Sequence, residues 1–137
     1  MAAVSDLQRA LDAYERRAWQ EAYDALSACE SLTAAQIDLL ADSAHWVGRP
    51  DETIAAYQRA YELHLADGDA RRAALSAFMT AIFLRLQGEG AQADGWQSRA
   101  LRLLADAEEG AEHGYPLYLE VAALMGRMMK PELHGLG

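Results

Sequence analysis

Glycine and proline divide this sequence into segments of the length that short helices need. The clearest division lies at Gly48 and Pro50, because glycine accepts the left-handed backbone that ends a helix and proline suits a helix's first turn. After it, Ile54, Tyr57 and Tyr61 recur at helical spacing. Alanine is common and runs of β-branched residues are absent, so the sequence predicts an all-α fold.

Similar signals predict about seven helices. Ser5 and Thr33 each precede a glutamine by three residues, which is the spacing of the capping box that begins a helix. The first turn is expected at Arg16 and Arg17, where the apolar phase changes although no glycine or proline is present. The helices are therefore expected at residues 5–15, 19–29, 34–47, 50–67, 70–87, 91–110 and 115–130.

These helices repeat as hairpins. The block that begins at Trp19 aligns with the block that begins at Pro50, at an offset of 31 residues. Gly48 aligns with Gly88 at an offset of 40 residues. Each block has small residues where two helices touch and a larger residue one turn away. A period in this range, built of helical hairpins, indicates a solenoid of stacked repeats.

The pattern resembles the tetratricopeptide repeat (TPR) family. The best-matching residues lie on both sides of one turn: Leu40, Ala41, Gly48, Ile54, Tyr57, Ala60 and Leu63. Thr53 stands where the family has alanine, and Gly90 stands where an aromatic residue is usual. The resemblance implies a right-handed solenoid of stacked antiparallel hairpins, with three hairpins and a C-terminal helix.

A closer likeness is to the N-terminal helical-repeat region of large actinobacterial regulators, which carry a LuxR-type helix-turn-helix at their C-terminal end. The segments that look like this region are ALDAYERRAWQEAYDALSA, HWVGRPDETIAAYQRAYELHLADGD and EHGY. No segment looks like the DNA-binding part. The likeness implies a bacterial sensing or interaction domain, present without its output domain or working independently.

Length and charge narrow the classes of partner. The chain has 137 residues, enough for one domain, so we expect a helical-repeat domain at 1–130 and a tail at 131–137. The net charge of −9, from 21 acidic and 12 basic residues, argues against direct binding to nucleic acid. No apolar run approaches the ~18 residues of a membrane span, and no signal peptide is recognisable. We therefore expect a cytoplasmic protein that does not bind membranes.

Motifs for metal, cofactor or covalent chemistry are not found in the sequence. The four histidines show no metal-binding spacing, and phosphate loops, dinucleotide fingerprints and nucleophile elbows are missing. His64, which lies near Asp67 and Asp69, is interpreted as part of a solvated helix end. The sequence thus predicts a non-enzymatic protein with no cofactor and no metal site.

The family resemblance implies that the first helix of each hairpin lines a concave groove. Carried over to this chain, the groove residues are Tyr14, Asp38, Asp42, His45, Trp46, Phe78, Ile82 and Arg85. Asp38, Asp42 and His45 are spaced four and three residues apart, so they share one helix face. The functional hypothesis is an acidic, aromatic-walled groove for a cationic peptide or ligand. The alternative is a solvated helix face whose aspartates provide solubility.

Other aromatic and apolar residues suggest packing and self-association. One set is interpreted as packing between hairpins: Trp19, Tyr57, Tyr61, Phe83 and Trp96. The expected last helix is apolar around much of its circumference, which favours a homodimer through Tyr118, Leu124, Met125, Met128 and Met129. Alternatives are a partner helix from a longer natural protein, or deep packing of a broadly amphipathic helix.

Three functions follow as hypotheses. The first is a TPR-like protein-protein interaction module, regulatory or scaffolding, that binds a peptide or protein partner in its groove. The second is a small-molecule sensor with an apolar pocket between the third, fifth and seventh helices, lined by Phe78, Ile82, Tyr118 and Met125. The third and weakest is an enzyme that uses such a pocket, with His45 and Asp42 as acid or base.

Overall fold

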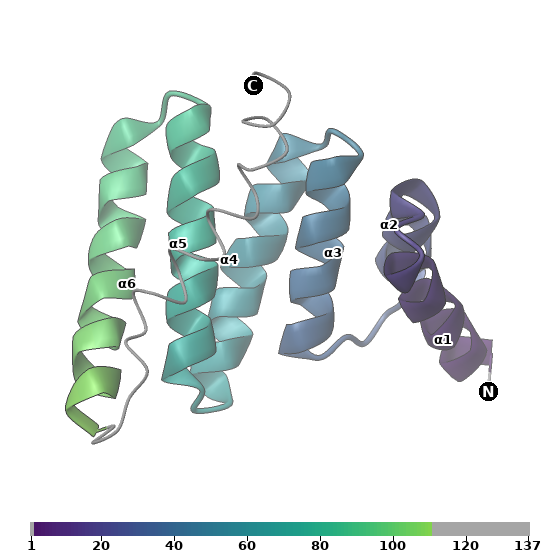
Figure 1. Cartoon of the computed structure of the whole chain (residues 1–137), viewed down its shortest axis with the longest axis horizontal. Helices are drawn as coiled ribbons and strands as arrows, with labels where there is room; N and C mark the ends of the chain where they lie inside the picture. Colours follow the sequence, from purple (N-terminus) through teal and green to yellow (C-terminus); the bar gives the residue numbers. More distant parts are fainter. Residues whose placement is uncertain (1, 111–137) are drawn as a thin grey trace.

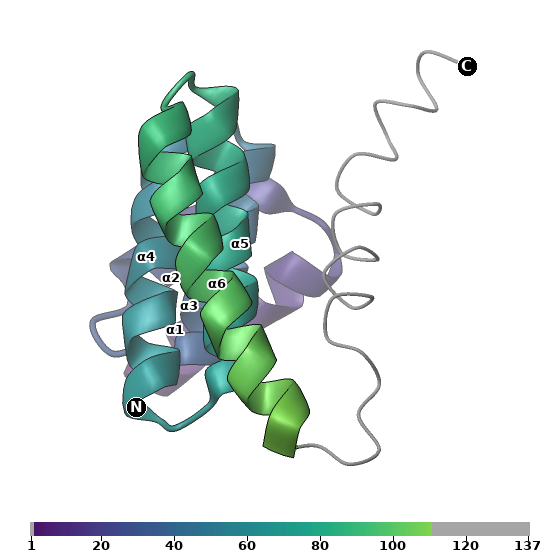
Figure 2. The same ribbon diagram turned by 90° about the vertical axis from the view of Figure 1, so that its left-hand side faces the viewer.

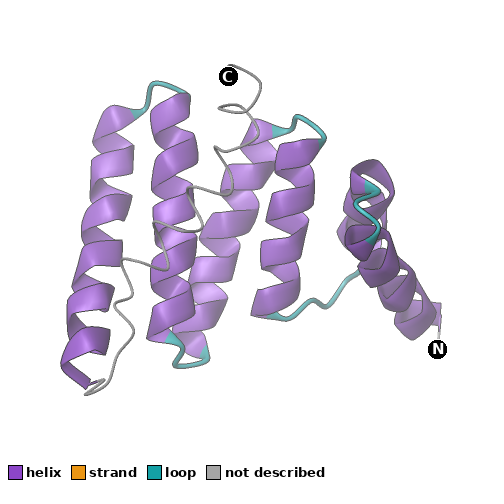
Figure 3. Ribbon diagram, viewed as in Figure 1, coloured by secondary structure: helices purple, strands orange, loops and turns teal. Residues whose placement is uncertain are grey.

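The described part of the chain is entirely α-helical. A computed structural model describes the backbone of residues 2–110 and the side chains of residues 6–106, with helices and no strand in that range (Figure 3). The helices are α1 (Ala2–Glu15), α2 (Trp19–Ala28), α3 (Ala34–Trp46), α4 (Pro50–Ala66), α5 (Ala70–Leu86) and α6 (Gly90–Gly110). The predicted all-α class is confirmed. The helix expected at 115–130 lies outside the described residues.

Most helix ends lie within one residue of their predicted positions. Thr33 caps α3 as expected: its side chain accepts a hydrogen bond from the Gln36 amide at 3.2 Å, and the Gln36 side chain accepts one from the Thr33 amide at 2.9 Å. The expected start at Ser5 is wrong, because α1 already begins at Ala2. Alanine is the strongest helix former, so two alanines ahead of Ser5 extend the helix toward the N-terminus.

Four of the five connections between helices share one turn geometry. In each turn an amide hydrogen-bonds to the carbonyl five residues earlier at 2.9 Å, and the residue before that amide has a positive φ. This is the Schellman ending, in which a left-handed residue satisfies the last carbonyls of a helix. The left-handed residues are Arg17 (φ 61), Gly48 (φ 78), Gly68 (φ 79) and Gly88 (φ 82). Arg17 therefore occupies the place of a glycine, which is why the first turn shows no glycine in the sequence.

Helices α3 to α6 stand side by side as antiparallel neighbours, and the α1–α2 hairpin is steeply tilted relative to them. Extensive contacts join consecutive helices: α1 with α2, α2 with α3, α3 with α4, α4 with α5 and α5 with α6. Figure 1 shows this row running from α6 to α3, with α1 and α2 at the far end. Figure 2, seen from the α6 end, shows the helices stacked one behind another. Hairpins α1–α2, α3–α4 and α5–α6 thus follow one another along the row.

Alanines at the helix contacts let the backbones approach closely. Ala41, Ala60, Ala77 and Ala100 are fully buried, one on each of four consecutive helices. Larger residues fill the spaces between them: Ile37, Ile54, Tyr57, Tyr61, Met79, Phe83 and Leu84 are all buried. Trp19 and Trp96 are half-buried against neighbouring rings, so the interpretation of the five aromatic residues as packing groups is confirmed. Within residues 2–110, no helix has both the length and the apolar character to cross a membrane.

Replacing glycine by alanine should change stability in opposite directions at a turn and inside a helix. Gly48→Ala should lower the free energy of unfolding by about 1–2 kcal/mol, because alanine disfavours a left-handed φ even where its Cβ meets nothing within 4 Å. Gly95→Ala should raise it by about 0.5–1 kcal/mol, because Gly95 lies inside α6 with equally open space around it. Urea denaturation of both variants measures the two values. Changes of the same sign would contradict this account of the turn.

Candidate functional site

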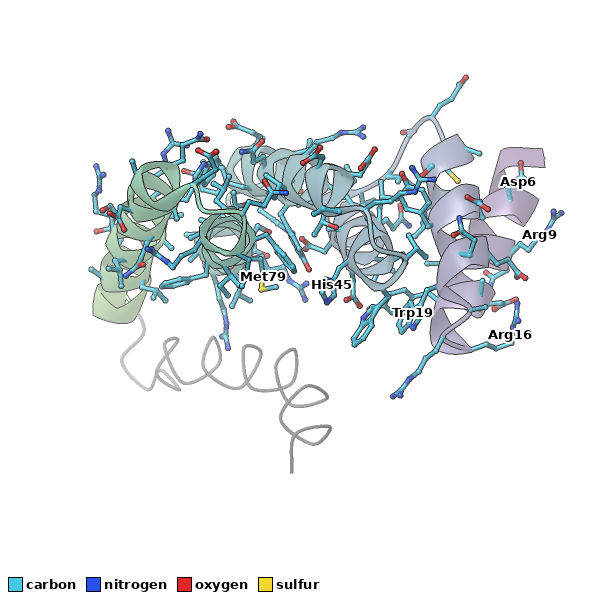
Figure 4. All side chains as sticks on the ribbon, turned by 90° about the horizontal axis from the view of Figure 1, so that it is seen from above. Asp6, Arg9, Arg16, Trp19, His45 and Met79 are labelled. Carbon is cyan, nitrogen blue, oxygen red and sulfur yellow. The ribbon has the colours of Figure 1, made fainter. Side chains whose placement is uncertain are left out.

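A row of contacting rings runs along one side of the helices. Trp19 makes an edge contact with Tyr14 at 5.4 Å and stacks on Trp46 at 5.8 Å between ring centroids. His45 contacts Trp46 and Phe83, both at 5.0 Å, and Phe83 stacks on Tyr57 at 6.0 Å. Figure 4 shows Trp19, His45 and Met79 on the same side of the helices. This aromatic row, Tyr14, Trp19, Trp46, His45, Phe83 and Tyr57, connects α1 to α5.

Beside the aromatic row, Asp38 on α3 is held by two other helices. Its Oδ2 lies 2.8 Å from Nε2 of His64 on α4, and its Oδ1 accepts a hydrogen bond from the Ser76 hydroxyl on α5 at 3.1 Å. Both partners are only 2% exposed, whereas the Asp38 side chain is 28% exposed. The interpretation of His64 as a solvated helix end is therefore wrong. Its ring lies in the protein interior and needs Asp38 as a hydrogen-bond partner.

Asp42, one turn further along α3, is held by the first helix. The Tyr14 hydroxyl donates a hydrogen bond to Asp42 Oδ2 at 2.6 Å, a short distance typical of an O–H donor to a carboxylate. Asp42 Oδ1 has no hydrogen-bond partner among the described side chains. Both carboxylates thus have hydrogen-bond partners on other helices.

The two carboxylates line one hollow, which we call the α3 pocket. Its volume is about 210 Å³. Its walls come from α1, α3, α4 and α5 and are mainly apolar or aromatic, and the lining residues are Tyr14, Asp38, Leu39, Asp42, Tyr57, Arg72, Leu75, Ser76 and Met79. The predicted residues Tyr14, Asp38 and Asp42 are thus brought together in one place.

Burial shapes the protonation of the pocket groups. Removal from water raises the pKa of Asp38 above its ordinary value of 3.8, against the lowering effect of its hydrogen bonds to His64 and Ser76. Burial, together with the hydrogen bond to Asp42, raises the pKa of Tyr14 well above 10.0. Burial also raises the pKa of Tyr57. Both phenols keep their hydrogens at neutral pH, so Tyr14 acts as a donor and the negative charge of the pocket comes from its aspartates.

The remaining predicted groove residues lie elsewhere. His45 and Trp46 belong to the aromatic row and do not line the α3 pocket, and 42% of Trp46 is exposed. Phe78, Ile82 and Arg85 line a separate hollow of about 440 Å³ between α5 and α6, here called the α5 hollow. Its other lining residues are Ala81, Leu86 and Gln97. The residues expected in the groove therefore line two hollows, with His45 and Trp46 in the aromatic row.

Arg85 points toward α6 and away from Asp38 and Asp42 of the α3 pocket. Its Nη2 atom lies 3.1 Å from Asp94 Oδ1 and donates to Gln97 Oε1 at 3.0 Å. Both partners lie on α6, so this contact fixes the side chain at the rim of the α5 hollow. Within the described part of the chain, Arg85 thus belongs to the hairpin contact and has no role in the α3 pocket.

The sequence interpretation missed several residues of the site, and one of them, the Asp38 partner His64, had a usable signal although it does not line the α3 pocket. His64 continues the buried stripe of α4 that contains Tyr57 and Tyr61, at spacings of four and three residues. That pattern predicts an inward-facing histidine, which then requires a polar partner. Leu39, Leu75, Ser76 and Met79 had no comparable signal, because apolar and small residues occur throughout these helices.

The structure says less about self-association, metal binding and the enzyme hypothesis. The self-association residues Tyr118, Leu124, Met125, Met128 and Met129 lie outside the described residues. Among the side chains that are described, no group of three or more His, Cys, Asp or Glu is placed to hold a metal ion. Among the described side chains, His45 makes ring contacts with Trp46 and Phe83 and no hydrogen bond with Asp42.

Comparison with family models, with curated proteins and with solved structures gives no match to this chain. The proposals for its function therefore rest on the geometry above and on the sequence pattern.

The buried histidine predicts that Asp38 stabilises the fold. Asp38→Ala should lower the free energy of unfolding by about 1–3 kcal/mol, because the buried His64 ring and Ser76 hydroxyl both lose their acceptor. Asp24→Ala is the matched control, since Asp24 is exposed on α2 and bonds only to the exposed Gln20, and should change stability by less than about 0.5 kcal/mol. Urea denaturation compares the two. Equal effects would show that the Asp38 contacts contribute nothing to the fold.

Proposed function

We propose that this chain is a non-enzymatic, TPR-like protein-protein interaction module that binds a cationic segment of a partner protein. The observation that carries the proposal is the α3 pocket. It combines two carboxylates, Asp38 and Asp42, with the aromatic walls of Tyr14 and Tyr57. Carboxylates attract a cation, and aromatic faces add a further attraction to it.

The size of the α3 pocket favours a side chain over a whole small molecule. Its volume of about 210 Å³ is below the roughly 300–1,000 Å³ of typical small-molecule sites. A single basic side chain with its aliphatic stem is a closer fit to this volume. The rest of the partner would then lie across the exposed surface beside the pocket, where Trp46 offers an aromatic contact of the kind enriched at binding hot spots.

The order of the helices supports the repeat character of the module. α1, α3 and α5 are the first helices of successive hairpins, and they supply Tyr14, Asp38 and Leu75 to one pocket. The recurrence of one turn geometry along the row fits a repeated unit. We propose on this basis a right-handed TPR-like solenoid of three hairpins, closed by a seventh helix at 115–130.

The setting is proposed from the sequence resemblance. The likeness to the N-terminal regions of LuxR-type regulators suggests a cytoplasmic, bacterial regulatory role without nucleic-acid binding by this chain. Homodimer formation through Tyr118, Leu124, Met125, Met128 and Met129 is part of the same proposal and rests on their apolar pattern.

Small-molecule sensing is the second candidate, and the α5 hollow favours it. With about 440 Å³, this hollow lies within the typical range for small-molecule sites, and Phe78, Ile82 and Leu86 give it an apolar lining. Phe78 and Ile82 are two of the four residues named for this hypothesis. A small apolar ligand that protects this hollow from solvent would favour the second function over the first.

The interaction proposal predicts that a mutation that fills the α3 pocket weakens the binding of selected peptides. Peptides selected from a random display library on the full chain should carry Arg or Lys. They should lose at least about tenfold in affinity for Leu75→Arg, which places a cation in the pocket. Leu65→Arg is the control: it adds the same charge on the exposed end of α4, outside the pocket, and should retain binding. Peptides that bind Leu75→Arg as well as the wild type would contradict the proposed site.

The raised pKa of Asp38 predicts that binding weakens in mild acid. A cation needs the ionised carboxylate, and burial makes Asp38 take up its proton at a pH above the ordinary value of 3.8. Affinity should therefore fall as the pH is lowered from 7 toward that raised pKa. Fluorescence polarisation with a selected peptide measures the profile, and circular dichroism over the same range checks that the helices persist. Affinity that stays constant down to pH 4 would contradict the role of Asp38.

A further inference from the structure

We infer that the α3 pocket selects an arginine side chain of the partner in preference to lysine. The inference rests on the proposed function, because it names the chemical group that the cationic segment inserts. Three features of the pocket carry it: the free acceptor positions, the apolar walls and the charge balance at the rim.

The carboxylates offer acceptors in a fixed arrangement. Asp42 Oδ2 is held by Tyr14, so the carboxylate plane is set while Oδ1 remains without a hydrogen bond among the described side chains. Each oxygen of Asp38 accepts one hydrogen bond, from His64 or Ser76, and has a second lone pair. Residues one helical turn apart lie roughly 5–6 Å apart at Cβ. Such a pair of oriented carboxylates matches the planar fork of five donors on a guanidinium better than the compact ammonium group of lysine.

The walls of the pocket reinforce this preference. Tyr14, Tyr57, Leu39, Leu75 and Met79 surround the carboxylates with aromatic and apolar groups. A cation that enters such a site gives up water on most of its surface. The guanidinium is weakly hydrated and stacks its flat faces on rings, whereas the ammonium is strongly hydrated and loses more on entry. The surroundings that attract a cation therefore discriminate between the two basic side chains.

The rim of the pocket already carries a guanidinium, that of Arg72. Its Nε lies 3.6 Å from Asp69 Oδ2 at the start of α5, and 58% of the Arg72 side chain is exposed. Asp38 is paired with His64, whereas Asp42 accepts its hydrogen bond from the neutral Tyr14 hydroxyl, so the negative charge of Asp42 is left for an incoming cation. Arg72 repels an incoming cation nonetheless, and removing its charge should strengthen binding without altering the walls.

The test titrates single amino-acid derivatives into the full-length chain and follows its NMR spectrum. Acetyl-arginine methylamide should give saturable shifts of the Tyr14, Tyr57 and Met79 side chains, with a millimolar Kd. Acetyl-citrulline methylamide has nearly the same shape without the charge and should bind at least about tenfold more weakly, as expected when charge-assisted hydrogen bonds are lost. The lysine derivative should bind roughly three- to tenfold more weakly than arginine.

Three variants test whether the arginine derivative binds in the α3 pocket. Asp42→Asn keeps an acceptor for Tyr14 but removes the charge, and should weaken arginine binding by about tenfold. Asp24→Asn removes one exposed charge on α2 and should leave the affinity unchanged. Arg72→Gln should strengthen binding by about two- to fivefold, because the repulsion at the rim is gone.

Several results would overturn the inference, and they can be told apart from failure of the proposed function. Equal binding of the arginine and lysine derivatives would remove the guanidinium preference, and equal binding of a norleucine derivative would make the pocket an apolar site. Absence of any shift with the small derivatives would overturn the inference alone if display-selected peptides still lose binding to Leu75→Arg. If those peptides ignore Leu75→Arg, the proposed function fails as well.

Discussion

The hydrogen bond between His64 and Asp38 is the interaction on which the candidate site depends. His64 is buried, and its ring nitrogen needs a partner that only a neighbouring helix can supply. With Asp38 ionised, the carboxylate can only accept, so Nε2 of His64 carries the hydrogen and donates it. Ser76 donates to the other oxygen from α5. One carboxylate thus joins α3, α4 and α5, and the same carboxylate lines the α3 pocket. The same residue thus serves the fold and the proposed binding site.

Local features of the sequence were enough to predict the helices but not every turn. Gly48, Gly68 and Gly88 mark left-handed helix ends, and Thr33 with Gln36 marks a helix start, because each feature depends on residues close in the chain. Arg17 could not be identified in this way. Its left-handed backbone accompanies the turn hydrogen bond from the Ala18 amide to the Ala13 carbonyl, and no local preference favours that backbone for arginine.

The site was predictable only where its residues share a helix. Spacing placed Asp38 and Asp42 on one face of α3, but their partners are far away in sequence: Tyr14 is 28 residues from Asp42, and His64 is 26 residues from Asp38. Such pairs depend on how hairpins stack, which spacing within one helix does not determine. The split of the expected groove has the same origin. On α5, Leu75 and Met79 form a stripe toward α3, whereas Phe78, Ile82 and Arg85 form the neighbouring stripe toward α6.

The partners of the two aspartates also explain why the α3 pocket is suited to an external cation. Ser76 and Tyr14 are neutral donors: they orient the carboxylates and satisfy part of their hydrogen-bonding capacity, but they do not neutralise the negative charge. Burial raises the pKa of Asp38, which means that its ionised form is less well solvated here than in water. Arg72 lies at the rim and is itself paired with Asp69, so it compensates the pocket only partly. A basic side chain that entered the pocket would supply the missing charge where the carboxylates are already oriented. Because the fold already holds the two carboxylates in place, such a side chain would bind with little loss of conformational entropy in the aspartates.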